Sequence, residues 1–219
     1  MKNKIVLACC CLLLSFTMLQ AQPAYYQDIQ KFKSADSAHF PAKQLILFIG
    51  SSSFTKWVDV QDYFPVHHIL NRAFGGSTLL NVIHYANDII FPYQPKQIVI
   101  YCGENDIASS DSITAKIVFN RFRQLFELIR SRLPLVPVAY VSMKPSPSRQ
   151  KFWPKMMEGN SMIRNYLKTK KNAAFIDVYH KMFNKDGTVM KDIFLEDNLH
   201  MNARGYAIWQ KIIAPYLLP

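Results

Sequence analysis

The stretch LILFIGSSSFTKW (residues 45–57) joins five consecutive apolar residues to a glycine and three serines. An apolar run that ends at a glycine is typical of a strand covered on both faces of a sheet. Three small hydroxyl residues directly after such a strand can form a simple turn, a phosphate-binding loop or the support of a nucleophile. The surrounding sequence must decide among these three possibilities.

Similar short apolar runs recur along the chain and alternate with segments of helical periodicity. The predicted strands are residues 45–49, 68–71, 97–102, 136–142 and 173–178. The predicted helices are residues 79–90, 114–132, 155–170 and a final amphipathic segment, 203–217. Alternation of this kind predicts parallel strands joined by crossover helices, and hence one doubly wound α/β domain.

The first 21 residues have the layout of a secretory signal peptide. Lys2 and Lys4 precede an almost unbroken apolar run from Ile5 to Met18, and Ala21 supplies the small residue of a cleavage site. The run is shorter than the ~20 apolar residues that a membrane-spanning helix needs. We therefore expect residues 1–21 to be removed and residues 22–219 to form one domain without a transmembrane span. The location expected for this domain is the periplasm or the cell exterior.

Charge and cysteine content exclude several other classes of protein. The chain has 26 basic and 15 acidic residues, but no basic motif interleaved with aromatic residues that would predict nucleic-acid binding. Three of the four cysteines lie in the signal segment, so Cys102 has no partner for an intramolecular disulfide. No cluster of side chains has the spacing of metal ligands, and we expect neither a metal nor another cofactor.

Polar residues follow four of the apolar segments, where a doubly wound sheet binds its ligands. These stretches are GSSS (50–53), FGGST (74–78), GEND (103–106) and EDNLHMN (196–202). Each has an ordinary structural alternative, since glycine–serine turns, helix caps and chance Asp-x-x-His pairs are all common. GSSS lacks the phosphate-binding loop pattern, and Phe54 replaces the second glycine of a Gly-x-Ser-x-Gly elbow. The ordered combination of the four stretches is therefore more informative than any one of them.

The segments FIGSSS, NRAFGGST, YCGEND and DNLHMNARGY resemble, in order and spacing, the sequence blocks of the SGNH hydrolases. This family is also called the GDSL esterase/lipase family. The first block departs from Gly-Asp-Ser because Ser51 replaces the aspartate, which is not a member of the family's catalytic triad. The resemblance implies a three-layer α/β/α sandwich with a flavodoxin-like, five-stranded parallel sheet.

The resemblance implies that Ser52 is the nucleophile, His200 its general base and Asp197 the acid that orients the histidine. This chemistry is physically consistent, because a serine hydroxyl needs a base and an aspartate on the far ring nitrogen selects the required tautomer. Asp177 is the alternative acid and ranks below Asp197. The other histidines have no acid at a matching spacing within a recognisable block; they are His39, His67, His68, His84 and His180.

The resemblance also assigns three donors to an oxyanion hole: the backbone N–H groups of Ser52 and Gly76 and the side-chain amide of Asn105. Such donors stabilise the negative charge of the tetrahedral intermediate. Asp106 is expected to brace its loop and to take no part in the reaction.

The function predicted is that of an exported serine esterase acting on small acyl esters, acetyl esters foremost, of small molecules or glycans. Alternatives are an acyltransferase using the same triad, a lysophospholipase or thioesterase acting on lipids, and a carbohydrate-binding protein without activity. Four aromatic residues can either stack on a sugar or belong to the core, and the core is favoured; they are Phe54, Trp57, Phe74 and Trp153.

Overall fold

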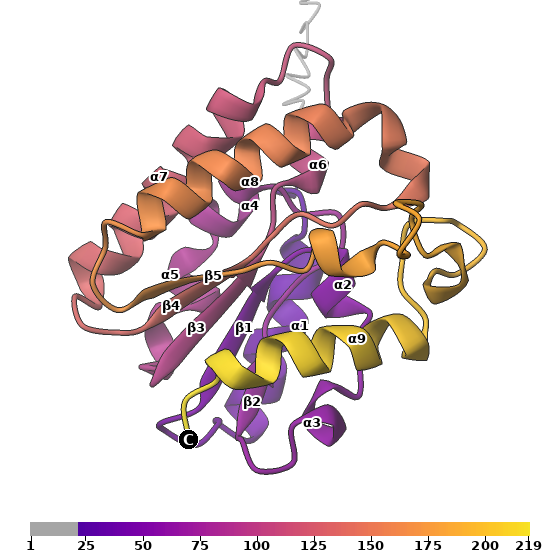
Figure 1. The fold of residues 1–219 in the computed structure, drawn as a ribbon. Coiled ribbons are helices and arrows are strands. Elements are labelled where there is room, and N and C mark those ends of the chain that lie inside the picture. The colour runs from indigo at the N-terminus through magenta and orange to yellow at the C-terminus, as the bar shows by residue number, and fades with distance from the viewer. Residues whose placement is uncertain (1–21) are drawn as a thin grey trace, which may run out of the picture.

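The structure is a computed structural model that describes residues 22–219, so the predicted signal peptide lies outside the described residues. Five parallel strands form one sheet in the order β2-β1-β3-β4-β5 (Figure 1). The strands are β1 (Ile46–Gly50), β2 (Ile69–Asn71), β3 (Gln97–Tyr101), β4 (Val138–Val141) and β5 (Ala173–Ile176). The predicted doubly wound, three-layer α/β/α fold is confirmed.

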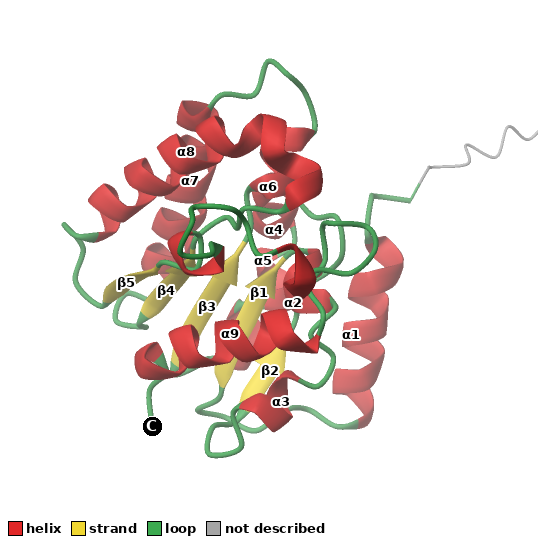
Figure 2. Ribbon diagram, turned by 45° about the vertical axis from the view of Figure 1, so that its right-hand side comes forward, coloured by secondary structure: helices red, strands yellow, loops and turns green. Residues whose placement is uncertain are grey.

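Helices cover both faces of the sheet, and each face has its own apolar core (Figure 2). Side chains alternate along a strand, so Leu47 and Ile49 enter one core while Ile46 and Phe48 enter the other. The first face carries α1 (Tyr26–Ala38), α4 (Leu79–His84), α5 (Ala86–Ile89), α6 (Glu104–Ala108), α7 (Ala115–Arg132) and α8 (Trp153–Leu167). The second carries α2 (Ser52–Thr55), α3 (Val60–Tyr63) and α9 (Ala203–Ile213). Burial on both faces explains why the central strands β1, β3 and β4 are almost entirely apolar, whereas the edge strands β2 and β5 are only partly buried.

Most helix boundaries follow local signals in the sequence. The Thr114 hydroxyl accepts a hydrogen bond from the Ile117 N–H at 3.3 Å and starts α7 where the sequence predicts it. The predicted helix 79–90 is instead two helices, α4 and α5, that meet at Tyr85. Tertiary contacts hold Tyr85, because its hydroxyl donates to the Ala24 carbonyl at 2.7 Å. Helix α1 was not predicted, since Ile29 is its single fully buried residue and the apolar periodicity is weak.

Two further features bear on the expectations from composition. Cys102 is a buried free thiol at the end of β3, and burial raises the pKa of this thiol well above its ordinary value. It is therefore a core residue and not a reactive nucleophile. Across residues 22–219, no helix combines the length and the apolar character that crossing a membrane requires.

Candidate active site

The turn after β1 presents one of its three serines. Ser51 and Ser53 are 2% and 1% exposed, whereas Ser52, the first residue of α2, is partly exposed. The Tyr206 hydroxyl of α9 donates to the Ser53 carbonyl at 2.8 Å and joins α9 to this turn. Of the three hydroxyl groups, that of Ser52 is therefore the one a substrate can reach.

Only glycine can occupy position 50, directly before these serines. Gly50 has φ +130°, and a Cβ atom there would lie 1.9 Å from the carbonyl oxygen of Tyr101. The Ser51 N–H donates to that same carbonyl at 2.9 Å, so β1 and β3 remain in close contact where the turn begins. The Gly50 carbonyl in turn accepts hydrogen bonds from the Phe74 N–H at 3.0 Å and the Ser77 hydroxyl at 2.9 Å. The serine turn and the FGGST stretch are thus tied together through Gly50.

Asp197 and His200 form a hydrogen-bonded pair. Asp197 Oδ2 lies 2.6 Å from His200 Nδ1, and Asp197 Oδ1 accepts the backbone N–H groups of Leu199 and His200, each at 2.9 Å. Burial raises the pKa of Asp197, but the hydrogen bonds from His200 and Leu199 outweigh it and hold this pKa well below its usual value. The aspartate therefore stays ionised and can fix the tautomer of the imidazole with a proton on Nδ1.

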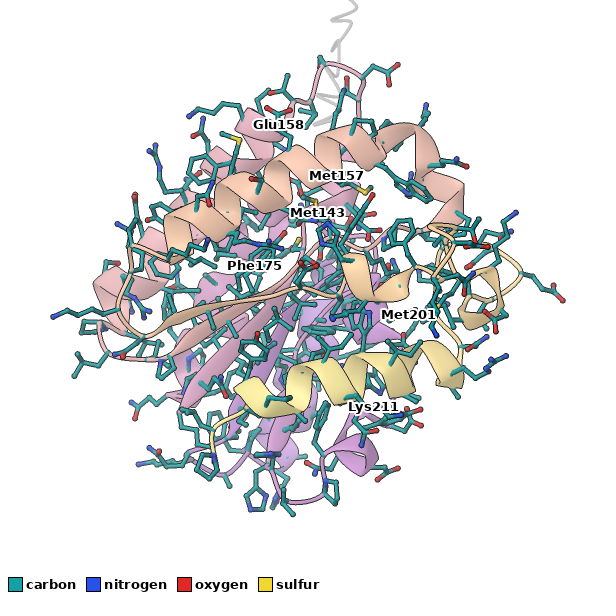
Figure 3. All side chains as sticks on the ribbon, viewed as in Figure 1. Met143, Met157, Glu158, Phe175, Met201 and Lys211 are labelled. Atoms are coloured by element: carbon teal, nitrogen blue, oxygen red, sulfur yellow. The ribbon has the colours of Figure 1, made fainter. Side chains whose placement is uncertain are left out.

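The loop that carries this pair is anchored on both sides. Asn202 caps α9 by accepting the N–H groups of Arg204 at 3.0 Å and Gly205 at 3.2 Å. The Ser148 N–H donates to the Asn198 carbonyl at 3.0 Å and ties the loop to the segment after β4. Met201, next to His200, is buried where the loop approaches the start of α9 (Figure 3).

No hydrogen bond joins Ser52 to His200 in the structure. His200 Nε2 is buried and makes no hydrogen bond to any part of residues 22–219. The imidazole as a whole is 14% exposed. The structure thus pairs Asp197 with His200, and α9, which follows this pair in the chain, contacts the serine turn through Tyr206 and the Ser53 carbonyl. A buried nitrogen with a lone pair and no partner is suited to accept a proton.

The Gly76 and Asn105 stretches meet beside the serine turn. The side-chain amide of Asn105 donates to the Ser77 carbonyl at 3.0 Å, and this amide has a second N–H. Gly76 has φ +80°, and its own N–H makes no hydrogen bond to the described part of the chain. Asp106 braces the arrangement, since its buried carboxylate accepts the Leu79 N–H at 2.9 Å and the Arg121 guanidinium at 2.8 Å. Burial raises the pKa of Asp106, and these two hydrogen bonds oppose the rise.

A second Asp-x-x-His pair, absent from the sequence interpretation, lies after β5. Asp177 Oδ2 lies 2.8 Å from His180 Nδ1, and Asp177 Oδ1 accepts the His180 N–H at 3.2 Å. The pair lies in none of the four stretches, and the sequence interpretation did not join Asp177 with His180. Asp177 also pairs with Arg164, and the His180 side chain is 63% exposed. Asp177 is thus engaged with its own partners and is not the acid beside His200.

Sequence reasoning also missed a buried ion pair between Glu104 and Lys144. Lys144 Nζ lies 3.2 Å from Glu104 Oε2, and the Lys144 N–H donates to Glu104 Oε1 at 3.0 Å. Burial lowers the pKa of Lys144, and the Glu104 carboxylate raises it. Met143, the preceding residue, lies between the end of β4 and α8, where its N–H donates to Asn160 at 2.9 Å (Figure 3). A lysine within three residues of the end of an apolar strand and a glutamate directly after Gly103 are the signals that could have indicated this pair.

The described residues contain no group of three or more His, Cys, Asp or Glu side chains arranged to hold a metal ion.

Comparison with known proteins agrees with the geometry. The profile of the GDSL-like Lipase/Acylhydrolase family matches residues 49–208, which include all four stretches, and the chain belongs to this family. It is therefore an enzyme, a serine hydrolase that acts on carboxylic ester bonds. No curated protein matches the chain in sequence.

Solved structures share the fold at low sequence identity. A GDSL-like lipase from Bacteroides thetaiotaomicron has a TM-score of 0.73 at 20% identity, over 86% of this chain and 96% of that one. A protein from Bacteroides fragilis that is described as an acylhydrolase has a TM-score of 0.75 at 20% identity, over 87% of this chain and 96% of that one. An acetylxylan esterase from Geobacillus stearothermophilus has a TM-score of 0.63 at 13% identity, over 78% of this chain and 93% of that one.

Proposed function

We propose that this enzyme hydrolyses small acyl esters, acetyl esters foremost, through a triad of Ser52, His200 and Asp197. The observation that supports the proposal is the Asp197–His200 pair, whose buried Nε2 has no hydrogen-bond partner within residues 22–219, together with a turn, contacted by α9, in which only Ser52 is partly exposed. Neither of the other serines of the turn can serve, because both are buried.

The proposed reaction has two stages. His200 Nε2 takes the proton of the Ser52 hydroxyl while the serine oxygen attacks the ester carbonyl carbon. The resulting oxyanion receives hydrogen bonds from the N–H groups of Ser52 and Gly76 and from the Asn105 amide. The C–O bond to the alcohol then breaks, the alcohol leaves with the proton from His200, and water releases the acyl group by the same steps.

The preference for a short acyl group has two supports. The crossover segments are about as long as the architecture needs and leave no large insertion to form a lid, and α2 and α6, which follow β1 and β3, are each only four or five residues long. The acetylxylan esterase with the same fold acts, by its description, on acetyl groups of a polysaccharide.

A glycan or a small molecule is the proposed carrier of the ester. Phe54, Trp57 and Phe74 are core residues and offer no face to a sugar. Trp153 is partly exposed, and its indole N–H donates to the Ser146 carbonyl at 3.1 Å, close to the loop of Asp197 and His200. Of the four aromatic residues, Trp153 is the one available for stacking.

Export to the periplasm or the cell exterior is the proposed location. It is supported by the basic, apolar and small-residue order of residues 1–21. Sequencing the amino terminus of the protein recovered outside the cytoplasm tests this, and a first residue of Gln22 is expected.

The decisive experiment is labelling of the mature protein by a serine-directed phosphonate, with Ser52→Ala and Ser51→Ala compared side by side. Wild type and Ser51→Ala should be labelled, and Ser52→Ala should not. Absence of labelling in the wild type would refute the proposal and favour a binding role.

Turnover of p-nitrophenyl acetate, butyrate and octanoate then measures acyl length. Rates should fall as the chain lengthens, and a preference for octanoate would instead favour a lipid hydrolase. Adding a sugar acceptor completes the test, because acyl transfer faster than hydrolysis would make the enzyme a transferase.

A further inference from the structure

A tyrosine outside the segment that matches the family contacts the proposed oxyanion site. Tyr25 precedes α1, and its hydroxyl donates to the carbonyl of Gly76 at 2.9 Å across 51 positions of sequence. Its ring packs against Phe74 with a centroid distance of 5.1 Å. A Cβ atom at Gly76 would lie 3.4 Å from the tyrosine oxygen, so Tyr25 borders directly on this glycine.

Two hydrogen bonds restrain the two residues at the centre of this loop: the Ser77 N–H donates to the Phe74 carbonyl at 3.4 Å and closes the turn, and the Tyr25 hydroxyl holds the Gly76 carbonyl. Phe74 and Ser77 on either side are held by the Gly50 carbonyl, and Ser77 is held also by Asn105. Between them, Gly75 and Gly76 are exposed, and within residues 22–219 the bond from Tyr25 is the one side-chain hydrogen bond they receive. Glycine has wide backbone freedom, so an unrestrained Gly76 would sample several orientations of its peptide groups.

Tyr25 is itself held in place. Its backbone is left-handed, with φ +65° and ψ +9°, a conformation that is unfavourable for a residue with a side chain. The adjacent Ala24 carbonyl accepts the Tyr85 hydroxyl at 2.7 Å, and the Tyr25 carbonyl accepts the Ile29 N–H at 3.1 Å. Unfavourable backbone conformations persist where the surroundings determine them, and they often occur near functional sites.

We propose that Tyr25 is a positioning residue for the oxyanion hole. The Gly76 carbonyl and the Gly76 N–H belong to adjacent peptide groups of one turn, which the Ser77 N–H closes on the Phe74 carbonyl. By holding the Gly76 carbonyl, the Tyr25 hydroxyl narrows the backbone torsions open to Gly76 and with them the range of directions of its N–H. A donor fixed in advance stabilises the developing oxyanion without reorganisation during the reaction. This inference rests on the proposed function, because it assigns Tyr25 a part in that reaction through Gly76.

The test is Tyr25→Phe, which removes the hydroxyl and retains the ring on Phe74. Tyr166→Phe is the matched control, because the Tyr166 hydroxyl contacts Glu127 at 3.4 Å on the surface of α7 and α8. With p-nitrophenyl acetate, Tyr25→Phe should lower kcat by about 3- to 10-fold, the effect of one hydrogen bond, with KM changed less than about twofold. The control should leave both constants unchanged. An unchanged kcat, or a rise in KM alone, would overturn the inference.

Hydrogen–deuterium exchange of a peptide covering residues 74–77 provides a readout that does not depend on esterase activity. Exchange there should be faster in Tyr25→Phe than in wild type and in Tyr166→Phe, with the strands unaffected. Equal exchange in all three proteins would overturn the inference even if kcat fell.

If the wild type hydrolyses no ester but exchange in Tyr25→Phe is faster, the proposed function fails while the restraint on Gly76 stands. If the wild type is active and Tyr25→Phe matches it, the proposed function survives and the role of Tyr25 does not.

Discussion

Glu104 and Lys144 form an ion pair in which both side chains are buried, with Lys144 only 1% exposed. The pair joins the start of α6, where Asn105 lies, to the loop that follows β4. Tyr101 completes it, because its hydroxyl donates to Glu104 and lies 3.2 Å from Lys144 Nζ. The cationic group of Lys144 is thus neutralised within the protein and is not available to an anionic substrate.

Removing one partner of this pair should destabilise the protein strongly, because the other charge remains buried without compensation. We expect Lys144→Met to lower the free energy of unfolding by about 3–5 kcal/mol. Denaturation by urea measures this, with Lys211→Met on the exposed face of α9 as the control. The double variant Glu104→Gln/Lys144→Met should recover part of the loss. Equal stability of Lys144→Met and wild type would show that the pair contributes nothing.

The three serines of the turn should differ sharply in their effect on turnover. Ser52→Ala should abolish hydrolysis of p-nitrophenyl acetate, because no other hydroxyl of the turn is exposed. Ser51→Ala and Ser53→Ala remove buried hydroxyls and should retain most of the activity. A large loss in Ser53→Ala with an unchanged melting temperature would contradict the choice of Ser52 as the sole nucleophile.

Asn105→Ala should lower kcat by about 10²- to 10³-fold, the usual cost of losing one oxyanion donor. The fold should persist, because Asp106 and the Gly50 carbonyl still hold the neighbouring stretches. Steady-state kinetics on p-nitrophenyl acetate provide the measurement, and circular dichroism the check on folding. Asn87→Ala, an exposed asparagine of α5, is the control and should behave as wild type. Turnover of Asn105→Ala at the wild-type rate would remove Asn105 from the oxyanion hole.

The fall in kcat/KM at acid pH should follow the uptake of one proton by the enzyme, and Asp197 should not be the group that binds it. The folded-state pKa of Asp197 is depressed, so the carboxylate remains ionised throughout the working range. Its contribution to the His200 pair is complete above about pH 4 and is lost only as pH falls through the depressed pKa. Measuring kcat/KM from pH 4 to 9 tests this. A two-proton slope between pH 4 and 6 would mean that the aspartate titrates there.

The two Asp-x-x-His pairs should be functionally distinct despite their equal spacing. His200→Ala should lose nearly all activity, because it removes the proposed base, whose Nε2 is buried without a hydrogen-bond partner among the described residues. His180→Ala should retain activity, because His180 is largely exposed and its aspartate also binds Arg164. Paired kinetic measurements on the two variants decide the matter. Inactivity of His180→Ala with an intact fold would require a second catalytic pair.

The sequence by itself determined the fold and the four stretches that border the site. Strands covered on both faces are apolar throughout, crossover helices carry an apolar stripe, and the residues that follow parallel strands gather at one edge. These are local rules, and a single sequence contains the information that they need.

The tertiary structure alone decided which side chains are buried, which are paired and which are free. The burial of Ser51 and Ser53, the engagement of Asp177 by Arg164 and the pairing of Glu104 with Lys144 depend on segments that are distant in sequence. The bond from Tyr25 to Gly76 is the clearest case, because α1 has little apolar periodicity and lies outside the segment that matches the family. Such contacts arise from packing across the sheet, and neither periodicity nor spacing along the chain contains that information.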